Sequence, residues 1–121
     1  MLFTKIKVWI RAARLRTLPL SISGIVVGNA LCVQDSKFSW VLFGLMVFTA
    51  IAFQIVSNLA NDYGDGVKGT DNAERVGPKR ELQAGLLSRI VLIKGIIWVT
   101  LLALLLAPTL ILTAFCSCLW F

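Results

Sequence analysis

Acidic and amide side chains gather in one stretch of the chain, directly after a long apolar run. Five of the six acidic residues lie between Asp62 and Glu81. If the apolar run continues as a helix past Ser57, three- and four-residue spacing places a column of oxygen donors on one face: Gln54, Asn58, Asn61, Asp62 and Asp65. Magnesium takes one or two protein carboxylates and completes its coordination shell with water and phosphate oxygens. The pattern therefore predicts a magnesium site that holds a phosphate or diphosphate group.

Glycines and basic residues follow these oxygen donors. We expect Gly64, Gly66 and Gly69 to break the helix and let the backbone turn. Positive charge comes from four residues of the same region: Lys68, Arg75, Lys79 and Arg80. For residues 71–81 a solvated loop that serves only solubility is an equally good interpretation. A calcium loop is disfavoured because the alternating ligand spacing and the terminal glutamate of such loops are absent. The glycines do not form a known phosphate-binding loop either, because neither GxGxxG after a strand nor GxxxxGK(S/T) occurs.

The composition indicates an integral membrane protein. Hydrophobic residues make up 58% of the 121 residues and charged residues 15%, which is too apolar for a soluble domain of this length. The net charge of +6 comes from basic residues that flank apolar runs, so an anionic bilayer surface is the expected partner and nucleic acid is not. The chain has no histidine, which excludes His-dependent nucleophilic catalysis and His-ligated metals. All three cysteines lie in apolar segments and are expected to be buried hydrophobic side chains.

Apolar runs and their interruptions predict an all-α membrane protein with an interfacial helix and three transmembrane helices. The expected segments are an interfacial amphipathic helix at 1–17, spans at 18–33, 40–60 and 88–107, a polar loop at 61–87, and an apolar tail at 109–121. Pro108 is expected to end the third span, and the tail is too short to cross alone, so it would be the start of a fourth. Trp40 stands where an interfacial aromatic residue is expected.

Basic residues set the expected orientation. Five Lys and Arg residues precede the first span, five lie between Lys68 and Arg89, and only Lys37 lies in the connection between the first two spans. Because Lys and Arg are enriched on the cytoplasmic side, the N-terminal segment and the polar loop are predicted to be cytoplasmic.

Two motifs resemble those of a known family. Residues 57–71 read Ser-Asn-Leu-Ala-Asn-Asp-Tyr-Gly-Asp-Gly-Val-Lys-Gly-Thr-Asp and are followed by Arg75-Val-Gly-Pro78 and Gly85. This resembles the first aspartate-rich motif of the UbiA-type intramembrane aromatic prenyltransferases, most closely their menaquinone branch, which acts on 1,4-dihydroxy-2-naphthoate. Residues 13–19, Ala-Arg-Leu-Arg-Thr-Leu-Pro, are similar to the entry into that family's first transmembrane helix, with Leu15 in place of a usual proline.

The resemblance implies a bundle of about nine helices in a bacterial cytoplasmic membrane. It also implies a reaction in which polyprenyl diphosphate ionises, Mg²⁺ takes up the diphosphate, and the allylic cation alkylates 1,4-dihydroxy-2-naphthoate with loss of carbon dioxide. By position in the motif, Asn61 and Asp65 match the core that binds magnesium and diphosphate. The remaining implied site residues are Asp62 and Asp71 as further acidic ligands, Lys68 and Arg75 as diphosphate contacts, Asn58 on the same face, and Arg14 at the cavity entrance.

The family's second aspartate-rich motif has no counterpart here, because no acidic residue follows Pro108. The chain is therefore expected to be an N-terminal portion of such an enzyme, part of a larger helix bundle and inactive alone. The alternative is a non-catalytic membrane subunit or assembly partner. The substitution Asp65→Asn in the complete protein separates the two. An enzyme would lose turnover and still insert into the membrane, whereas a structural subunit would lose assembly.

Overall fold

The computed structural model describes residues 2–34, 38–68 and 85–119. The elements are α1 (Leu2–Ala12), the short 3₁₀ helix η1 (Leu15–Thr17), α2 (Leu18–Gln34), α3 (Trp40–Lys68) and α4 (Arg89–Leu119). No strand occurs among these described residues. The predicted all-α fold is confirmed.

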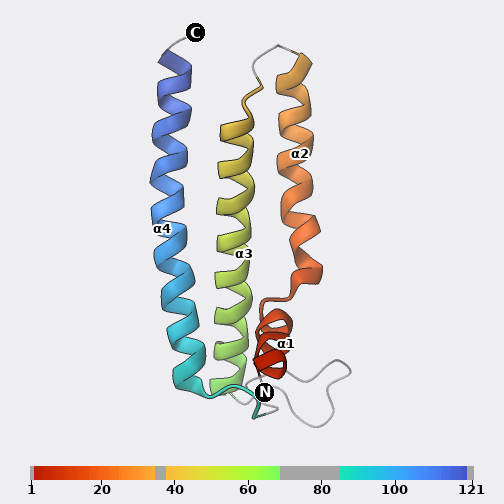
Figure 1. Ribbon diagram of the computed structural model, residues 1–121, viewed down its shortest axis with the longest axis vertical. Coiled ribbons are helices and arrows are strands. Elements are labelled where there is room, and N and C mark those ends of the chain that lie inside the picture. The colour runs from red at the N-terminus through yellow and green to blue at the C-terminus, as the bar shows by residue number, and fades with distance from the viewer. Residues whose placement is uncertain (1, 35–37, 69–84, 120–121) are drawn as a thin grey trace.

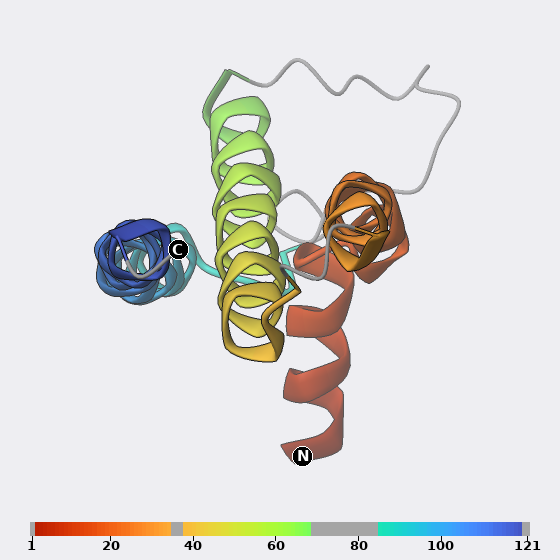
Figure 2. The same ribbon diagram turned by 90° about the horizontal axis from the view of Figure 1, so that it is seen from above.

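Helix α3 lies between α2 and α4, and the three run side by side with their neighbours antiparallel (Figure 1). When the molecule is turned by 90°, α2 and α4 are seen end-on, whereas α1 is seen along its length (Figure 2). Helix α1 therefore crosses the direction of α2 and α4 at the end of the bundle where α3 finishes. An interfacial helix beside membrane-spanning helices is expected to have this arrangement.

Helices α3 and α4 are each long and apolar enough to cross a membrane. In the most apolar window of each helix only 11% is buried, which is unlike the core helix of a soluble protein. Large apolar side chains along both helices are instead exposed, among them Phe48, Phe53, Leu105 and Phe115. The apolar stretch formed by η1 and α2, Leu15–Leu31, is shorter. The described helices thus support a membrane protein, and the number of three spans stays a prediction.

Helix α3 continues to Lys68, so the expectation that Gly64 and Gly66 break the helix was wrong. Where the second span ends along α3 stays a prediction. A glycine inside a helix costs about 1 kcal/mol relative to alanine, an amount that tertiary packing readily offsets. Here Leu59 is buried in the main apolar cluster and Tyr63 packs against that cluster, which holds the last turns of α3 in place. Gly69 lies outside the described residues.

Helix α4 passes through Pro108 and ends at Leu119, so the expectation that Pro108 ends the third apolar helix was also wrong. Where the third span ends along α4 stays a prediction. Pro108 lacks the backbone NH that would bond the Leu104 carbonyl, a loss that other contacts within a membrane helix can offset. Further hydrogen bonds are made in the turn before the proline. The Thr109 hydroxyl donates to the carbonyls of Leu105 and Leu106 at 3.2 and 2.7 Å. Residues 109–119 therefore extend α4 and do not begin a fourth helix.

The main apolar cluster joins α1 to the ends of α3 and α4. It contains Val8, Ala12, Leu59, Leu87 and Leu92, and Leu92 has no exposed surface. At its edge the Trp9 indole lies directly against Gly95, so close that a Cβ atom built on Gly95 would be 2.6 Å from Trp9 Cζ3. Ile6 and Ile10, on the opposite side of α1, are each 47% exposed. The packing thus fixes α1 through one face and leaves the opposite face open.

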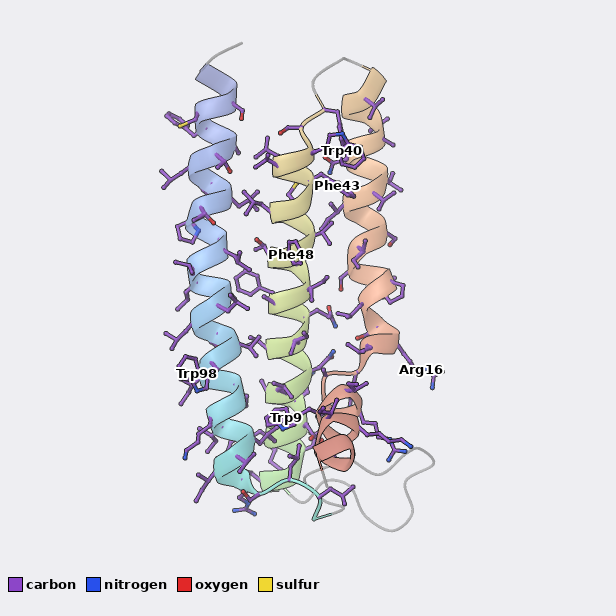
Figure 3. All side chains as sticks on the ribbon, in the orientation of Figure 1. Trp9, Arg16, Trp40, Phe43, Phe48 and Trp98 are labelled. Carbon is purple, nitrogen blue, oxygen red and sulfur yellow. The ribbon has the colours of Figure 1, made fainter. Side chains whose placement is uncertain are left out.

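Aromatic side chains mark the other end of the bundle. The ring of Trp40 makes edge-to-face contacts with Phe38 and Phe43, with centroid separations of 4.9 and 6.2 Å. Trp40 is 78% exposed, and it lies with Phe43 near the start of α3 (Figure 3). Exposed tryptophan at the end of an apolar helix is typical of a membrane interface.

Candidate functional site

The last four turns of α3 carry the predicted oxygen donors on one side of the helix. At 3.6 residues per turn, the five donors fall within about 100° of the helix circumference. Their burial follows their angular order: Asp62 and Asn58 are buried, Asp65 and Gln54 are half-buried, and Asn61 is exposed. The predicted column therefore exists, and it is tilted so that one edge faces protein and the other faces outward.

Asp62 is the most deeply buried acidic residue of the described chain, with 3% of its surface exposed. A carboxylate buried to this extent is costly unless it is compensated by polar or charged partners. Asp65 lies one turn further along α3 and is half-buried, while Lys68 is exposed in the last turn. The C-terminal end of α3 thus combines two carboxylates and the Asn61 amide with an adjacent cation.

A hydrogen-bond network lies one to two turns before the acidic residues and connects α3 to the corner between α1 and α2. The Asn58 Nδ2 atom donates to the Ala13 carbonyl at 2.8 Å and to the Thr17 hydroxyl at 3.1 Å. Gln54 Nε2 lies 3.4 Å from both Thr17 Oγ1 and Asn58 Oδ1. The Ser21 hydroxyl donates to Gln54 Oε1 at 2.7 Å. The network brings together residues from α2, α3 and the corner.

Asn58, predicted as a substrate-binding residue, uses both hydrogens of its amide nitrogen in this network. Thr17 and Ser21 take part as well and were not predicted from the sequence. The available signal was the presence of short hydroxyl side chains at the start of an apolar helix. A partner 33 or 37 residues away in the sequence, as Gln54 is, cannot be inferred from local spacing.

Arg14 forms the corner itself. It has φ 51° and ψ 56°, in the left-handed region, and is half-buried. Its carbonyl accepts hydrogen bonds at 2.9 Å from both the backbone NH and the hydroxyl of Thr17. Arg16, by contrast, is exposed and points away from the helices (Figure 3). Two further predicted site residues, Asp71 and Arg75, lie outside the described residues.

The donor set on α3 suits a hard cation such as Mg²⁺, which prefers carboxylate and amide oxygens and keeps several water or phosphate ligands. Asp62, Asp65 and Asn61 carry oxygens of this kind. Within the described ranges no group of three or more His, Cys, Asp or Glu residues could hold a metal ion. The chemistry of the α3 donors is thus compatible with part of a magnesium site, and their role as ligands stays a prediction.

These features define a class: a helical protein of membrane type, with a magnesium-compatible oxygen face at the end of one long apolar helix. Comparison with curated proteins narrows the class. The chain is 42% identical over 86 residues to a 1,4-dihydroxy-2-naphthoate octaprenyltransferase of Escherichia coli, covering 71% of the chain and 28% of the relative. It is 42% identical over 90 residues to the protein of that name from Haemophilus influenzae, and this match covers 73% of the chain and 29% of the relative. It is 38% identical over 111 residues to the protein of that name from Mycobacterium leprae, and this match covers 85% of the chain and 37% of the relative.

The chain is a homologue of part of the 1,4-dihydroxy-2-naphthoate octaprenyltransferases, and the predicted relationship to the menaquinone branch of the UbiA-type prenyltransferases is confirmed. It spans between about a quarter and two fifths of the length of these relatives. No family model matches the chain, and no solved structure matches it.

Proposed function

We propose that the chain takes part in transferring a polyprenyl group from polyprenyl diphosphate to 1,4-dihydroxy-2-naphthoate, within menaquinone biosynthesis. In this reaction the bond between the allylic carbon and the diphosphate oxygen breaks, and a new carbon–carbon bond forms on the ring as carbon dioxide leaves. The observation that carries the proposal is the oxygen face of α3, which combines the carboxylates of Asp62 and Asp65 with Asn61 in a chain related to enzymes named for this transfer.

In the proposed site Asn61, Asp62 and Asp65 hold the magnesium ion, and Asp71 is a further ligand. Magnesium, when bound, would neutralise the negative charge of the departing diphosphate. Lys68 and Arg75 are the proposed contacts to the diphosphate oxygens, and positive groups there stabilise the charge that develops on them. The outer apolar surfaces of α3 and α4 supply a hydrocarbon environment for the isoprenoid chain, and exclusion of water protects the allylic cation.

The proposed location is the bacterial cytoplasmic membrane, with α1 and the acidic end of α3 on the cytoplasmic side. The lateral placement of α1 and the exposed apolar surfaces of α3 and α4 support it, as does the excess of Lys and Arg in the N-terminal segment and around the polar stretch. The three-span interpretation counts α2 with α3 and α4. We propose that oxygen donors beyond α3 complete the site, since α3 provides two carboxylates.

A chimera tests the proposed activity. The aligned segment of the Escherichia coli relative is replaced by the corresponding residues of this chain, and octaprenyl transfer to 1,4-dihydroxy-2-naphthoate is measured in membranes with Mg²⁺. We expect transfer by the chimera, loss of transfer with Asp65→Asn, and normal transfer with the control Ser57→Ala, since Ser57 is exposed on the same helix. A chimera in which Asp65→Asn inserts and transfers as well as its parent would contradict the catalytic role and favour a structural one.

A further inference from the structure

Thr17 occupies the centre of the network between the corner and α3. Its hydroxyl donates to the Arg14 carbonyl at 2.9 Å and accepts from Asn58 and Gln54 at 3.1 and 3.4 Å. A hydroxyl group has one donor and two acceptor positions, so all three are used. Asn58 adds a bond to the Ala13 carbonyl at 2.8 Å. The carbonyl of Ala13 is thereby bonded directly to α3, and the carbonyl of Arg14 is linked to α3 through the Thr17 hydroxyl.

Arg14 is held in a conformation that an arginine does not adopt readily. Among the described residues it is the one residue other than glycine with a positive φ. The left-handed region costs roughly 1–2 kcal/mol for an L-residue with a side chain and nothing for glycine. Residues in such conformations persist where their surroundings fix them, and they concentrate at functional sites. An arginine at a position that glycine would occupy without strain indicates a use for its side chain.

The network also ties the corner to α3 close to its acidic end. Asn58, which binds the Ala13 carbonyl, precedes Asp62 by four residues, about 6 Å along the helix axis. The residue next to Arg14 is thus anchored about one turn of α3 before the buried carboxylate. A cation at this corner could share a bound diphosphate with a magnesium ion on Asp62 and Asp65.

We propose that Thr17, Gln54 and Asn58 form a polar clamp that positions Arg14 for binding the diphosphate group, and that Asn58 is a positioning residue and not a ligand of the substrate. Ser21 supports the clamp by fixing the Gln54 side-chain amide. The inference rests on the proposed magnesium-diphosphate site. It adds a specific mechanism, in which hydroxyl and amide groups within the bundle control the position of one cation.

The test measures Mg²⁺-dependent binding of inorganic pyrophosphate to the 121-residue chain in phosphatidylcholine nanodiscs. Thr17→Val, which removes all three hydrogen bonds at nearly constant shape, is expected to weaken binding by roughly three- to tenfold. Thr17→Ser, which keeps the hydroxyl, is expected to restore it. Thr113→Val is the matched control, because the Thr113 hydroxyl bonds only carbonyls of its own helix, and no change is expected.

A double-mutant cycle separates positioning from a general structural role. If Thr17 acts through Arg14, Thr17→Val has no further effect on pyrophosphate binding in an Arg14→Gln chain. An equal loss with and without Arg14, or wild-type binding by Thr17→Val, would overturn the inference. Gln54→Met, which removes the same contact from the α3 side, provides a second variant if Thr17→Val fails to fold.

A distance measurement keeps the inference separate from the proposed function. Spin labels at Leu15 and Phe48, both exposed, report the position of the corner relative to α3 in a chain whose three native cysteines are replaced by alanine. Thr17→Val is expected to broaden the distance distribution, and Thr17→Ser is expected to preserve it. Absence of pyrophosphate binding by the wild-type chain together with this broadening would refute the diphosphate site and leave the clamp. An unchanged distribution in Thr17→Val and Gln54→Met would refute the clamp itself.

Discussion

Replacing Gly95 by alanine is expected to push α1 away from α4. The added Cβ would be 2.6 Å from Trp9 Cζ3 and nearer still to Trp9 Cη2, whereas carbon atoms pack favourably at about 3.5–4.0 Å, so the indole must retreat by more than about 1 Å. Such overpacking costs about 1–3 kcal/mol. The same substitution gains about 1 kcal/mol of helix propensity. Because Val8 and Ala12 share the cluster beside Trp9, displacement of the ring loosens the docking of α1 as a whole.

Gly44→Ala is the matched control for Gly95→Ala. Gly44 is also inside a long apolar helix, but a Cβ built on it meets nothing within 4 Å. It should therefore show the propensity gain without the clash, and the free energies of unfolding of the two variants should differ by about 1–3 kcal/mol.

The assay for Gly95→Ala follows the fluorescence of Trp9 as the only tryptophan, with Trp40, Trp98 and Trp120 replaced by phenylalanine. We expect a red-shifted emission and stronger iodide quenching in Gly95→Ala, and an earlier midpoint of unfolding in dodecyl sulfate. Emission, quenching and midpoint that match those of Gly44→Ala would refute the packing of Trp9 on Gly95.

Three further changes test the fold. Pro108→Ala restores the NH that can bond the Leu104 carbonyl, so it should raise stability without changing the membrane protection of residues 109–117, measured by thiol labelling. Leu92→Ala should cost about 2–5 kcal/mol, because this side chain has no exposed surface, whereas Leu104→Ala, at 61% exposed, should change the unfolding free energy little. Gly64→Ala should stabilise α3 by up to about 1 kcal/mol, measured by thermal loss of helical circular dichroism, since nothing lies within 4 Å of the added Cβ.

The opposite results would each contradict a specific feature. A change in the labelling of residues 109–117 in Pro108→Ala would contradict an α4 that already continues through Pro108. Equal effects of Leu92→Ala and Leu104→Ala would contradict the cluster between α1 and α4. Loss of helix in Gly64→Ala would contradict the continuation of α3 through this residue.

Apolar run length was sufficient to predict the helices, but it did not predict where they end. The runs that became α3 and α4 are longer and more apolar than is usual in a soluble domain, so their existence follows from composition. Whether Gly64 or Pro108 ends a helix depends on small propensity costs that other contacts can offset. The Tyr63 packing and the Thr109 hydroxyl bonds supply such contacts here.

The oxygen face of α3 was predictable because helical periodicity alone brings its residues together. The tilt of this face could not be predicted, because the burial of Asp62 and the exposure of Asn61 depend on the elements that pack around α3. The clamp could not be predicted from the sequence for the same reason. The bond between Asn58 and Ala13 joins residues 45 positions apart, and only the tertiary fold creates it.

Metal and pyrophosphate binding by the 121-residue chain in nanodiscs tests the magnesium site most directly. With Mn²⁺ in place of Mg²⁺, paramagnetic resonance of the bound ion reports its coordination. We expect pyrophosphate-dependent Mn²⁺ binding to the wild-type chain, weakening by about ten- to hundredfold in Asp65→Asn, and no change in Ser57→Ala. Equal binding by wild type and Asp65→Asn would contradict the assignment of the site to α3, and no binding by either would contradict a site that this chain forms without further donors.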